Sequence, residues 1–76
     1  MPAMGIPMAQ SDVDRRIGVQ IRSARLLAGM TERQLADDLA ITVQDLIQFE
    51  GGSKRMPPEI LVRAAKIFDV SLKYFF

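Results

Sequence analysis

The chain has 76 residues, of which 49% are hydrophobic and 25% are charged, and its formal net charge is +1. That length allows one domain with a modest core, and the composition is too apolar for a disordered protein. The sequence contains neither cysteine nor histidine, which excludes disulfides and thiolate metal sites and removes the usual general base. We therefore expect no enzyme, no metal site and no cofactor.

The first ten residues are apolar, but they contain neither lysine nor arginine and are interrupted by Pro2, Gly5 and Pro7. This pattern is unlike a secretory signal, which has a basic start followed by an unbroken apolar stretch. No apolar run in the chain approaches the roughly 18 residues that span a bilayer. We expect a flexible arm over residues 1–10, a domain over residues 11–76, and a cytoplasmic protein without a membrane partner.

The first predicted helix begins at Ser11, which is followed by Asp14 in a pattern resembling a capping box. Apolar residues then recur at helical spacing from Val13 to Ala28, with arginines at many of the remaining positions. Gly29 is predicted to end this helix, because glycine adopts the left-handed conformation of a C-terminal cap without steric cost.

Two short helices are predicted next, over residues 31–39 and 42–50. Each opens with a threonine that can cap the helix, followed three residues later by an acidic or amide side chain. The two pairs are Thr31 with Gln34 and Thr42 with Asp45.

The turn between these two helices contains Ala40, and an alanine is tolerated there if it stays near helical backbone angles. So short a turn does not allow the helices to pack antiparallel. They are therefore expected to cross steeply, as in a helix-turn-helix.

The C-terminal third contains a loop and two further predicted helices. Glycines, prolines and two basic residues indicate a loop over residues 51–58. Pro57-Pro58-Glu59 is typical of the start of a fourth helix, because proline fits the first helical position. Asp69 stands where a glycine cap would be expected, and Ser71 is predicted to cap a short fifth helix. No period-two pattern indicates a strand, so the predicted fold class is all-α with five helices.

Charge is unevenly distributed along the chain. Residues 1–30 sum to +2, residues 31–50 to −4 and residues 51–76 to +3. The predicted pair of short helices is therefore acidic and its flanks are basic.

Five motifs follow one another through residues 13–76. They are Ile17-Gly18-x-x-Ile21-Arg22-x-x-Arg25, Gly29-Met30-Thr31, Leu35-Ala36-x-x-Leu39, Ile41-Thr42-x-x-x-Leu46-x-x-Phe49-Glu50-x-Gly52 and Leu61-x-x-Ala64-Ala65-x-x-Phe68-x-Val70-Ser71-Leu72-x-Tyr74-Phe75. This pattern resembles the lambda-repressor-like (Cro/phage-repressor, XRE-type) helix-turn-helix family of DNA-binding proteins. The resemblance implies a compact domain whose second and third helices form the helix-turn-helix.

The resemblance also implies a DNA interface in which the third helix enters the major groove. Residues expected to contact base edges are Val43, Gln44, Ile47 and Gln48. Residues expected to face phosphates are Thr42, Ser53, Lys54, Arg55 and Arg25. The same resemblance implies an ion pair between Arg25 and Glu50.

Three positions depart from the family pattern. Glu32 occupies a position where the family favours glutamine against the DNA backbone, Ala40 replaces a turn glycine, and Gly51 replaces a residue that is often basic. The acidic Glu32 and the β-branched Val43 and Ile47 would also suit contact with a protein.

Two functions follow from these observations. The first is a sequence-specific, double-stranded DNA-binding transcriptional regulator, such as a repressor, that acts as a homodimer and is associated with the nucleoid. The alternative is a helix-turn-helix repurposed as a protein-interaction module, which binds another regulator or polymerase or is antitoxin-like. Dimerisation is expected to use apolar residues of the C-terminal half that exceed what a small core absorbs: Ile60, Ile67, Leu72, Tyr74, Phe75 and Phe76.

Overall fold

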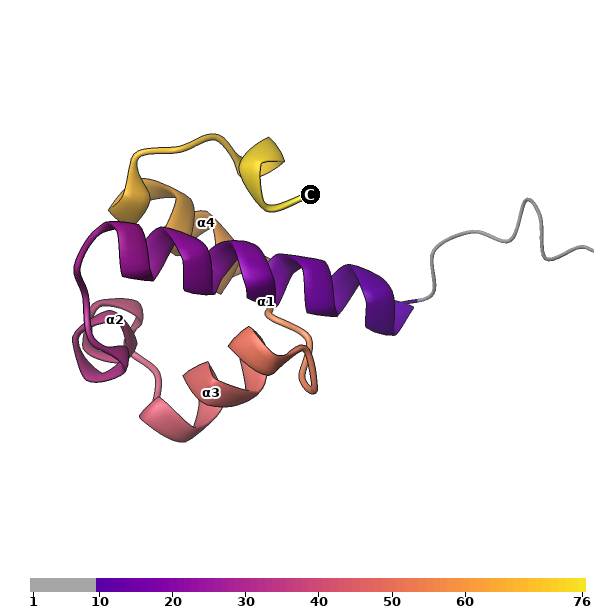
Figure 1. The fold of residues 1–76 in the computed structure, drawn as a ribbon, viewed down its shortest axis with the longest axis horizontal. Coiled ribbons are helices and arrows are strands. Elements are labelled where there is room, and N and C mark those ends of the chain that lie inside the picture. The colour runs from indigo at the N-terminus through magenta and orange to yellow at the C-terminus, as the bar shows by residue number, and fades with distance from the viewer. Residues whose placement is uncertain (1–9) are drawn as a thin grey trace, which may run out of the picture.

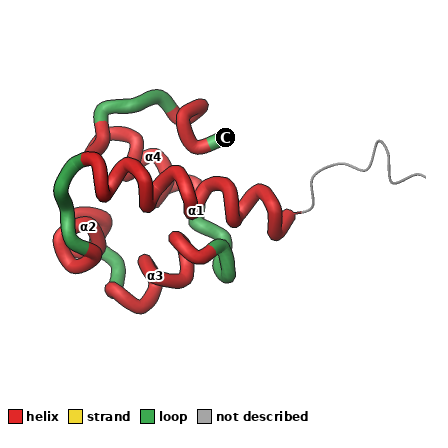
Figure 2. The backbone as a smooth tube through the Cα atoms, viewed as in Figure 1, coloured by secondary structure: helices red, strands yellow, loops and turns green. Residues whose placement is uncertain are grey.

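The computed structural model describes residues 10–76, which contain four α-helices and one turn of 3₁₀ helix joined by loops (Figures 1 and 2). Apart from Gln10, the expected arm over residues 1–10 lies outside the described residues. The helices are α1 (Gln10–Leu27), α2 (Glu32–Leu39), α3 (Val43–Gly51) and α4 (Pro58–Phe68), and the 3₁₀ turn is η1 (Leu72–Phe75).

The long helix α1 is the element around which the others are arranged. The pair α2 and α3 lies along one side of α1, and η1 lies along the other (Figure 1). In this view α2 is seen close to end-on while α3 lies across the page, so the two short helices cross steeply.

The expected all-α class is confirmed, but only four of the five expected helices are α-helices. The last element is a four-residue 3₁₀ turn, and the Ser71 side chain makes no capping hydrogen bond to it. The turn is held by Phe75, which is fully buried, and by Gln20, whose Nε2 donates to the carbonyl oxygen of Tyr74 at 2.8 Å. Phe75 is therefore a core residue and is not surplus apolar surface.

The ends of α1 agree only in part with expectation. The helix begins at Gln10, so Ser11 is a helical residue and does not occupy the cap position. At the other end Gly29 has a φ of +70°, as expected of a C-terminal cap glycine. The N–H of Met30 then donates to the carbonyl oxygen of Arg25 at 3.0 Å, which closes the last turn.

The caps predicted for the two short helices are present. At α2, the Thr31 hydroxyl accepts from the Gln34 N–H and the Gln34 side chain accepts from the Thr31 N–H, which is a complete capping box. At α3, the Thr42 hydroxyl accepts from the Asp45 N–H at 3.0 Å, but the Asp45 carboxylate does not bond back to the cap. It binds Lys54 instead.

The condition under which alanine would be tolerated in the turn without strain is not met. Ala40 has φ 60° and ψ 41°, which is left-handed, and its N–H donates to the end of α2. Asp69 adopts the same conformation at the end of α4, in the position where a glycine cap was expected. In both cases the chain turns sharply at the end of the helix through a left-handed residue. Because neither residue is a glycine, its Cβ makes this conformation sterically costly.

One continuous core connects all the elements. Its twelve buried members are Ile17, Ile21, Leu35, Ala36, Leu39, Leu46, Phe49, Met56, Leu61, Ala64, Ala65 and Phe75.

We predict that Ala40→Gly stabilises the domain by about 0.5–1 kcal/mol, because it removes a Cβ from a left-handed residue. Thermal or urea unfolding monitored by circular dichroism measures this change. Ala28→Gly is the matched control, since Ala28 does not have a positive φ, and it should destabilise by up to about 1 kcal/mol. Equal effects of the two substitutions would contradict the prediction.

Candidate nucleic-acid interface

The helix-turn-helix unit is built from local hydrogen bonds and a shared apolar interior. The turn is closed by the Ile41 N–H, which donates to the Ala36 carbonyl oxygen at 2.9 Å. Buried Leu39 and Leu46 anchor the two helices in the core. Their outer faces are left to the solvent.

The face that α3 presents to solvent is mixed in character. Gln44 is exposed, Ile47 is 45% exposed and Gln48 is half-buried. Val43 is also half-buried and packs against the core. Of the two apolar residues expected on this surface, Ile47 is therefore the more accessible.

The two hydroxyl residues expected to face phosphates lie at the two ends of α3. Thr42 is exposed at the N-cap, and its hydroxyl already accepts from Asp45 while its own hydrogen remains available to donate. Ser53 is exposed after the C-terminal end, and its Oγ donates to the Gln48 carbonyl oxygen at 3.3 Å.

The basic pair in the loop after α3 is exposed but paired with carboxylates. Lys54 Nζ lies 2.9 Å from Asp45 Oδ1, and Arg55 Nε lies 3.7 Å from Asp14 Oδ1. The Lys54 and Arg55 side chains are 48% and 61% exposed. Both cations can reach solvent, and both have an intramolecular competitor for any phosphate.

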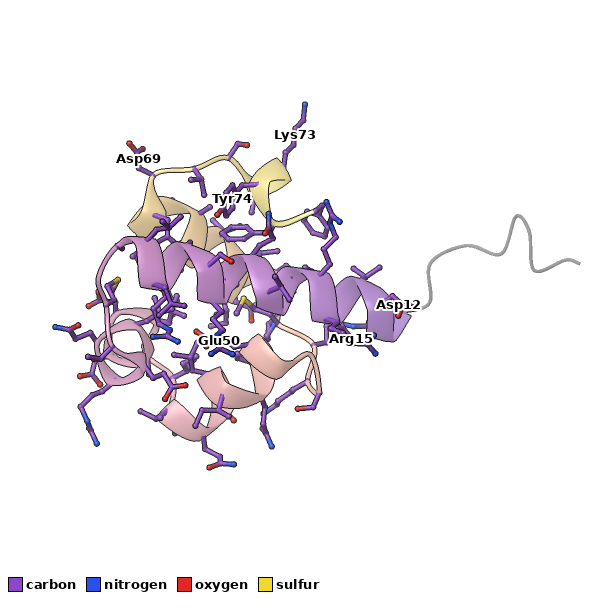
Figure 3. The ribbon with its side chains drawn as sticks, viewed as in Figure 1. Asp12, Arg15, Glu50, Asp69, Lys73 and Tyr74 are labelled. Atoms are coloured by element: carbon purple, nitrogen blue, oxygen red, sulfur yellow. The ribbon has the colours of Figure 1, made fainter. Side chains whose placement is uncertain are left out.

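The ion pair expected between Arg25 and Glu50 is present in the interior of the domain. Its carboxylate partner, Glu50, is labelled in Figure 3. Arg25 Nε and Nη2 donate to the two Glu50 carboxylate oxygens at 2.8 and 3.2 Å, and Nη1 donates to the Met30 carbonyl oxygen at 3.0 Å. The hydrogen bond to Glu50 raises the pKa of Arg25 above its ordinary value, against the opposing effect of burial. The pair joins the last turn of α1 to the C-terminal half of α3.

This burial bears on the second role expected for Arg25. The residue is only 7% exposed and its Nε, Nη1 and Nη2 all donate within the chain. Its guanidinium group is therefore engaged inside the domain and has little access to a DNA phosphate.

Two residues that matter for the site are given no structural role by the sequence analysis. A Cβ placed on Gly18 would overlap the carbonyl oxygens of Phe49 and Glu50, so this glycine permits the close contact between α1 and α3. Arg63 of α4 donates to the Leu39 carbonyl oxygen at 2.7 Å and satisfies the end of α2. Only the glycine had a signal, as a member of the first motif.

In the part of the chain that covers residues 10–76, no three His, Cys, Asp or Glu residues gather in a way that could hold a metal ion. None of its helices is both long enough and apolar enough to cross a membrane.

Comparison with known proteins agrees with this architecture. A family model described as helix-turn-helix matches residues 21–75. The chain is 31% identical over 64 residues to an uncharacterized HTH-type transcriptional regulator of Sinorhizobium medicae, covering 84% of this chain and 46% of that protein. A similarly named protein of Rickettsia conorii is 36% identical over 64 residues, with coverages of 84% and 51%. The chain thus spans about half the length of these relatives.

Solved structures share the fold. The clp gene regulator ClgR of Corynebacterium glutamicum superposes with a TM-score of 0.79 at 25% identity, over 91% of this chain and 69% of that one. The restriction-modification controller protein C.AhdI of Aeromonas hydrophila superposes with a TM-score of 0.78 at 18% identity, over 87% and 98% of the two chains. The fold and the crossed pair α2 and α3 define a helix-turn-helix domain. The chain belongs to the helix-turn-helix family, and its lambda-repressor-like resemblance is confirmed.

We predict that Glu50→Ala destabilises the domain by about 3 kcal/mol, because it leaves a buried guanidinium without its partner. Urea denaturation measures the loss. The double substitution Arg25→Leu, Glu50→Leu should lose less than Glu50→Ala alone, since no unpaired charge then remains buried. A Glu50→Ala protein that unfolds at the wild-type urea concentration would contradict a structural role for the pair.

Proposed function

We propose that the chain is a sequence-specific, double-stranded DNA-binding transcriptional regulator that places α3 in the major groove. The observation that carries this proposal is the solvent-facing side of α3, which carries two glutamines and belongs to a helix held near its C-terminal end by the Arg25–Glu50 pair. Gln44 is exposed and Gln48 is half-buried, and they lie one helical turn apart on this side. A glutamine can donate to and accept from an adenine edge at once.

Phosphate contacts would orient the helix without reading sequence. Thr42 and Ser53 offer hydroxyl groups near the two ends of α3, and Lys54 and Arg55 offer positive charge in the following loop. Ile47 suits contact with a thymine methyl group, and Val43 would add to it from its half-buried position. A regulator of this kind acts in the cytoplasm at the nucleoid.

Selection of bound duplexes from a random DNA pool, followed by affinity measurements across salt concentrations, tests the proposal. A preferred site bound at least a thousandfold more tightly than random duplex would support sequence-specific recognition. Binding that stays in the nonspecific range of roughly 10⁻⁴–10⁻⁶ M at physiological salt for every sequence would refute it.

We predict that Gln44→Ala and Gln48→Ala each cost about 1–3 kcal/mol on the selected site and little on random duplex, because base-edge hydrogen bonds carry the sequence information. Fluorescence anisotropy with both duplexes measures the difference. Lys73→Ala is the control, since Lys73 is exposed on η1, across α1 from α3 (Figure 3). A loss of equal size on both duplexes would remove the two glutamines from base recognition.

A protein-binding function is the second candidate, and the surface chemistry of α2 and α3 favours it. Ile47 is an apolar side chain of α3 that is 45% exposed. Glu32 is the first residue of α2, and Asp37 and Asp38 of the same helix are exposed. A carboxylate at the start of α2 would repel a DNA phosphate. Under this alternative, Ile47→Ser abolishes capture of a partner protein and no duplex is bound above the nonspecific range.

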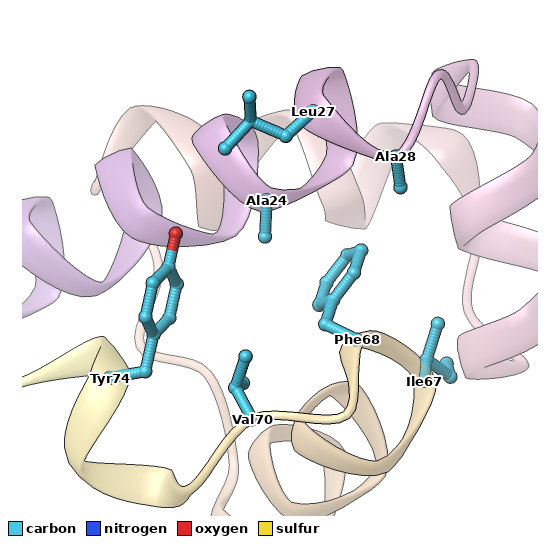
Figure 4. A pocket seen from close by; sticks show the side chains of 7 residues that line it. All are labelled: Ala24, Leu27, Ala28, Ile67, Phe68, Val70 and Tyr74. Atoms are coloured by element: carbon cyan, nitrogen blue, oxygen red, sulfur yellow. The ribbon is translucent and has the colours of Figure 1, made fainter.

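The regulator is proposed to act as a homodimer, because one such domain contacts few base pairs and two half-sites give usable specificity. A groove of about 370 Å³ lies between the end of α1 and the segment joining α4 to η1 (Figure 4). Leu27 lines it and is 86% exposed. A second copy that offers the same groove and leucine would cover both apolar surfaces by a two-fold contact.

We predict that the chain sediments as a dimer at high micromolar concentration without DNA and that Leu27→Ser shifts it toward monomer. Val19→Ser is the control, because Val19 is 53% exposed on α1 outside this groove. A wild-type protein that sediments as a monomer would exclude a preformed dimer. Equal effects of the two substitutions would exclude this groove as the interface.

A further inference from the structure

The ammonium group of Lys54 is held against α3 by two contacts. Nζ lies 2.9 Å from Asp45 Oδ1 and 5.7 Å from the centroid of the Phe49 ring. The two charged side chains are 48% and 36% exposed, so the pair lies at the surface, beside the residues proposed to read DNA. The cation expected to bind phosphate is therefore already neutralised within the same helix-and-loop unit.

The neighbouring cation of the loop is held in a similar way. Arg55 Nε lies 3.7 Å from Asp14 Oδ1, and the Asp14 side chain is only 12% exposed. Both basic residues of the loop thus face a carboxylate, one from α3 and one from α1. The loop carries two positive charges in sequence but presents little net positive charge to an approaching phosphate.

A phosphate that binds Lys54 competes with the Asp45 carboxylate for the same ammonium group, and Lys54 contributes its full charge only if that carboxylate is displaced. Exposed ion pairs are weak, so the displacement is feasible but has a cost. The displaced Asp45 would then lie near the phosphate with the same sign of charge. Because the pair is neutral as a whole, it also contributes little to the release of counterions that drives DNA binding.

We propose that Asp45 limits the affinity of this surface for every duplex by holding Lys54 away from phosphate. The effect is independent of sequence, because phosphate contacts carry no sequence information. It would keep the protein from being retained on the large excess of nonspecific DNA that competes with a specific site. The inference rests on the proposed function for its ligand, duplex DNA.

The test is Asp45→Asn in the full chain, measured by anisotropy with a short duplex of random sequence over a range of salt concentrations. Asparagine keeps the size of the side chain and the backbone N–H that donates to Thr42. Affinity at physiological salt should rise roughly three- to tenfold, and the salt slope should steepen by about 0.9. An affinity within twofold of wild type, or an unchanged slope, would overturn the proposal.

Two further variants separate the ion pair from a general change in charge. Asp69→Asn makes the same change in net charge at an exposed residue across α1 from α3 (Figure 3), and asparagine tolerates its left-handed conformation. Its affinity should stay within twofold of wild type. In a Lys54→Gln background, Asp45→Asn should raise affinity by twofold or less. The proposal would be overturned if Asp69→Asn raised the affinity as much as Asp45→Asn does. It would also be overturned if Asp45→Asn raised the affinity equally in the Lys54→Gln background.

Failure of this proposal is distinguishable from failure of the proposed function. A preferred duplex together with an unaltered Asp45→Asn protein would reject the role of Asp45 and keep sequence-specific binding. If Asp45→Asn steepens the salt slope on random duplex but no preferred site is found, the role of Asp45 is kept and sequence-specific binding is rejected. Wild-type and Asp45→Asn proteins that bind no duplex even at low salt would reject both.

Discussion

The contact between α1 and α3 is the constraint on which the rest of the domain depends. Arg25 and Glu50 form a buried, doubly hydrogen-bonded pair, and Gly18 lets the two helices approach until a Cβ would no longer fit. Both features act on the C-terminal half of α3. The orientation of the whole helix, including the exposed Gln44 near its N-terminal end, is therefore set by α1 and not by the short turn alone.

The surface around α3 combines features that serve different purposes. Thr42 and the exposed glutamine side chain suit hydrogen bonding to DNA, whereas Ile47 suits an apolar contact with either a thymine methyl group or a protein. The pairing of Lys54 and Arg55 with carboxylates makes the local charge smaller than the sequence suggests. A surface of this kind would depend on the fit of α3 more than on general attraction to phosphate.

The tertiary structure gives several residues a role that differs from the one predicted from the sequence. Phe75 was expected to contribute to surplus apolar surface, but it is fully buried. Val43 was expected on the exposed face of α3, but it packs partly against the core. Arg25 was expected both to pair with Glu50 and to face DNA, and burial leaves only the first role.

The sequence by itself determined where most helices begin and end. Helix caps act over only three or four residues, so their pattern can be recognised in the sequence. Examples are the pair Thr31 and Gln34, the cap Thr42 and the terminal Gly29. The Arg25–Glu50 pair was found only through resemblance to a family, because its partners are 25 residues apart. Only the tertiary structure decided which carboxylate neutralises Lys54 or Arg55 and which glycine permits close packing, since these contacts depend on how separate helices are brought together.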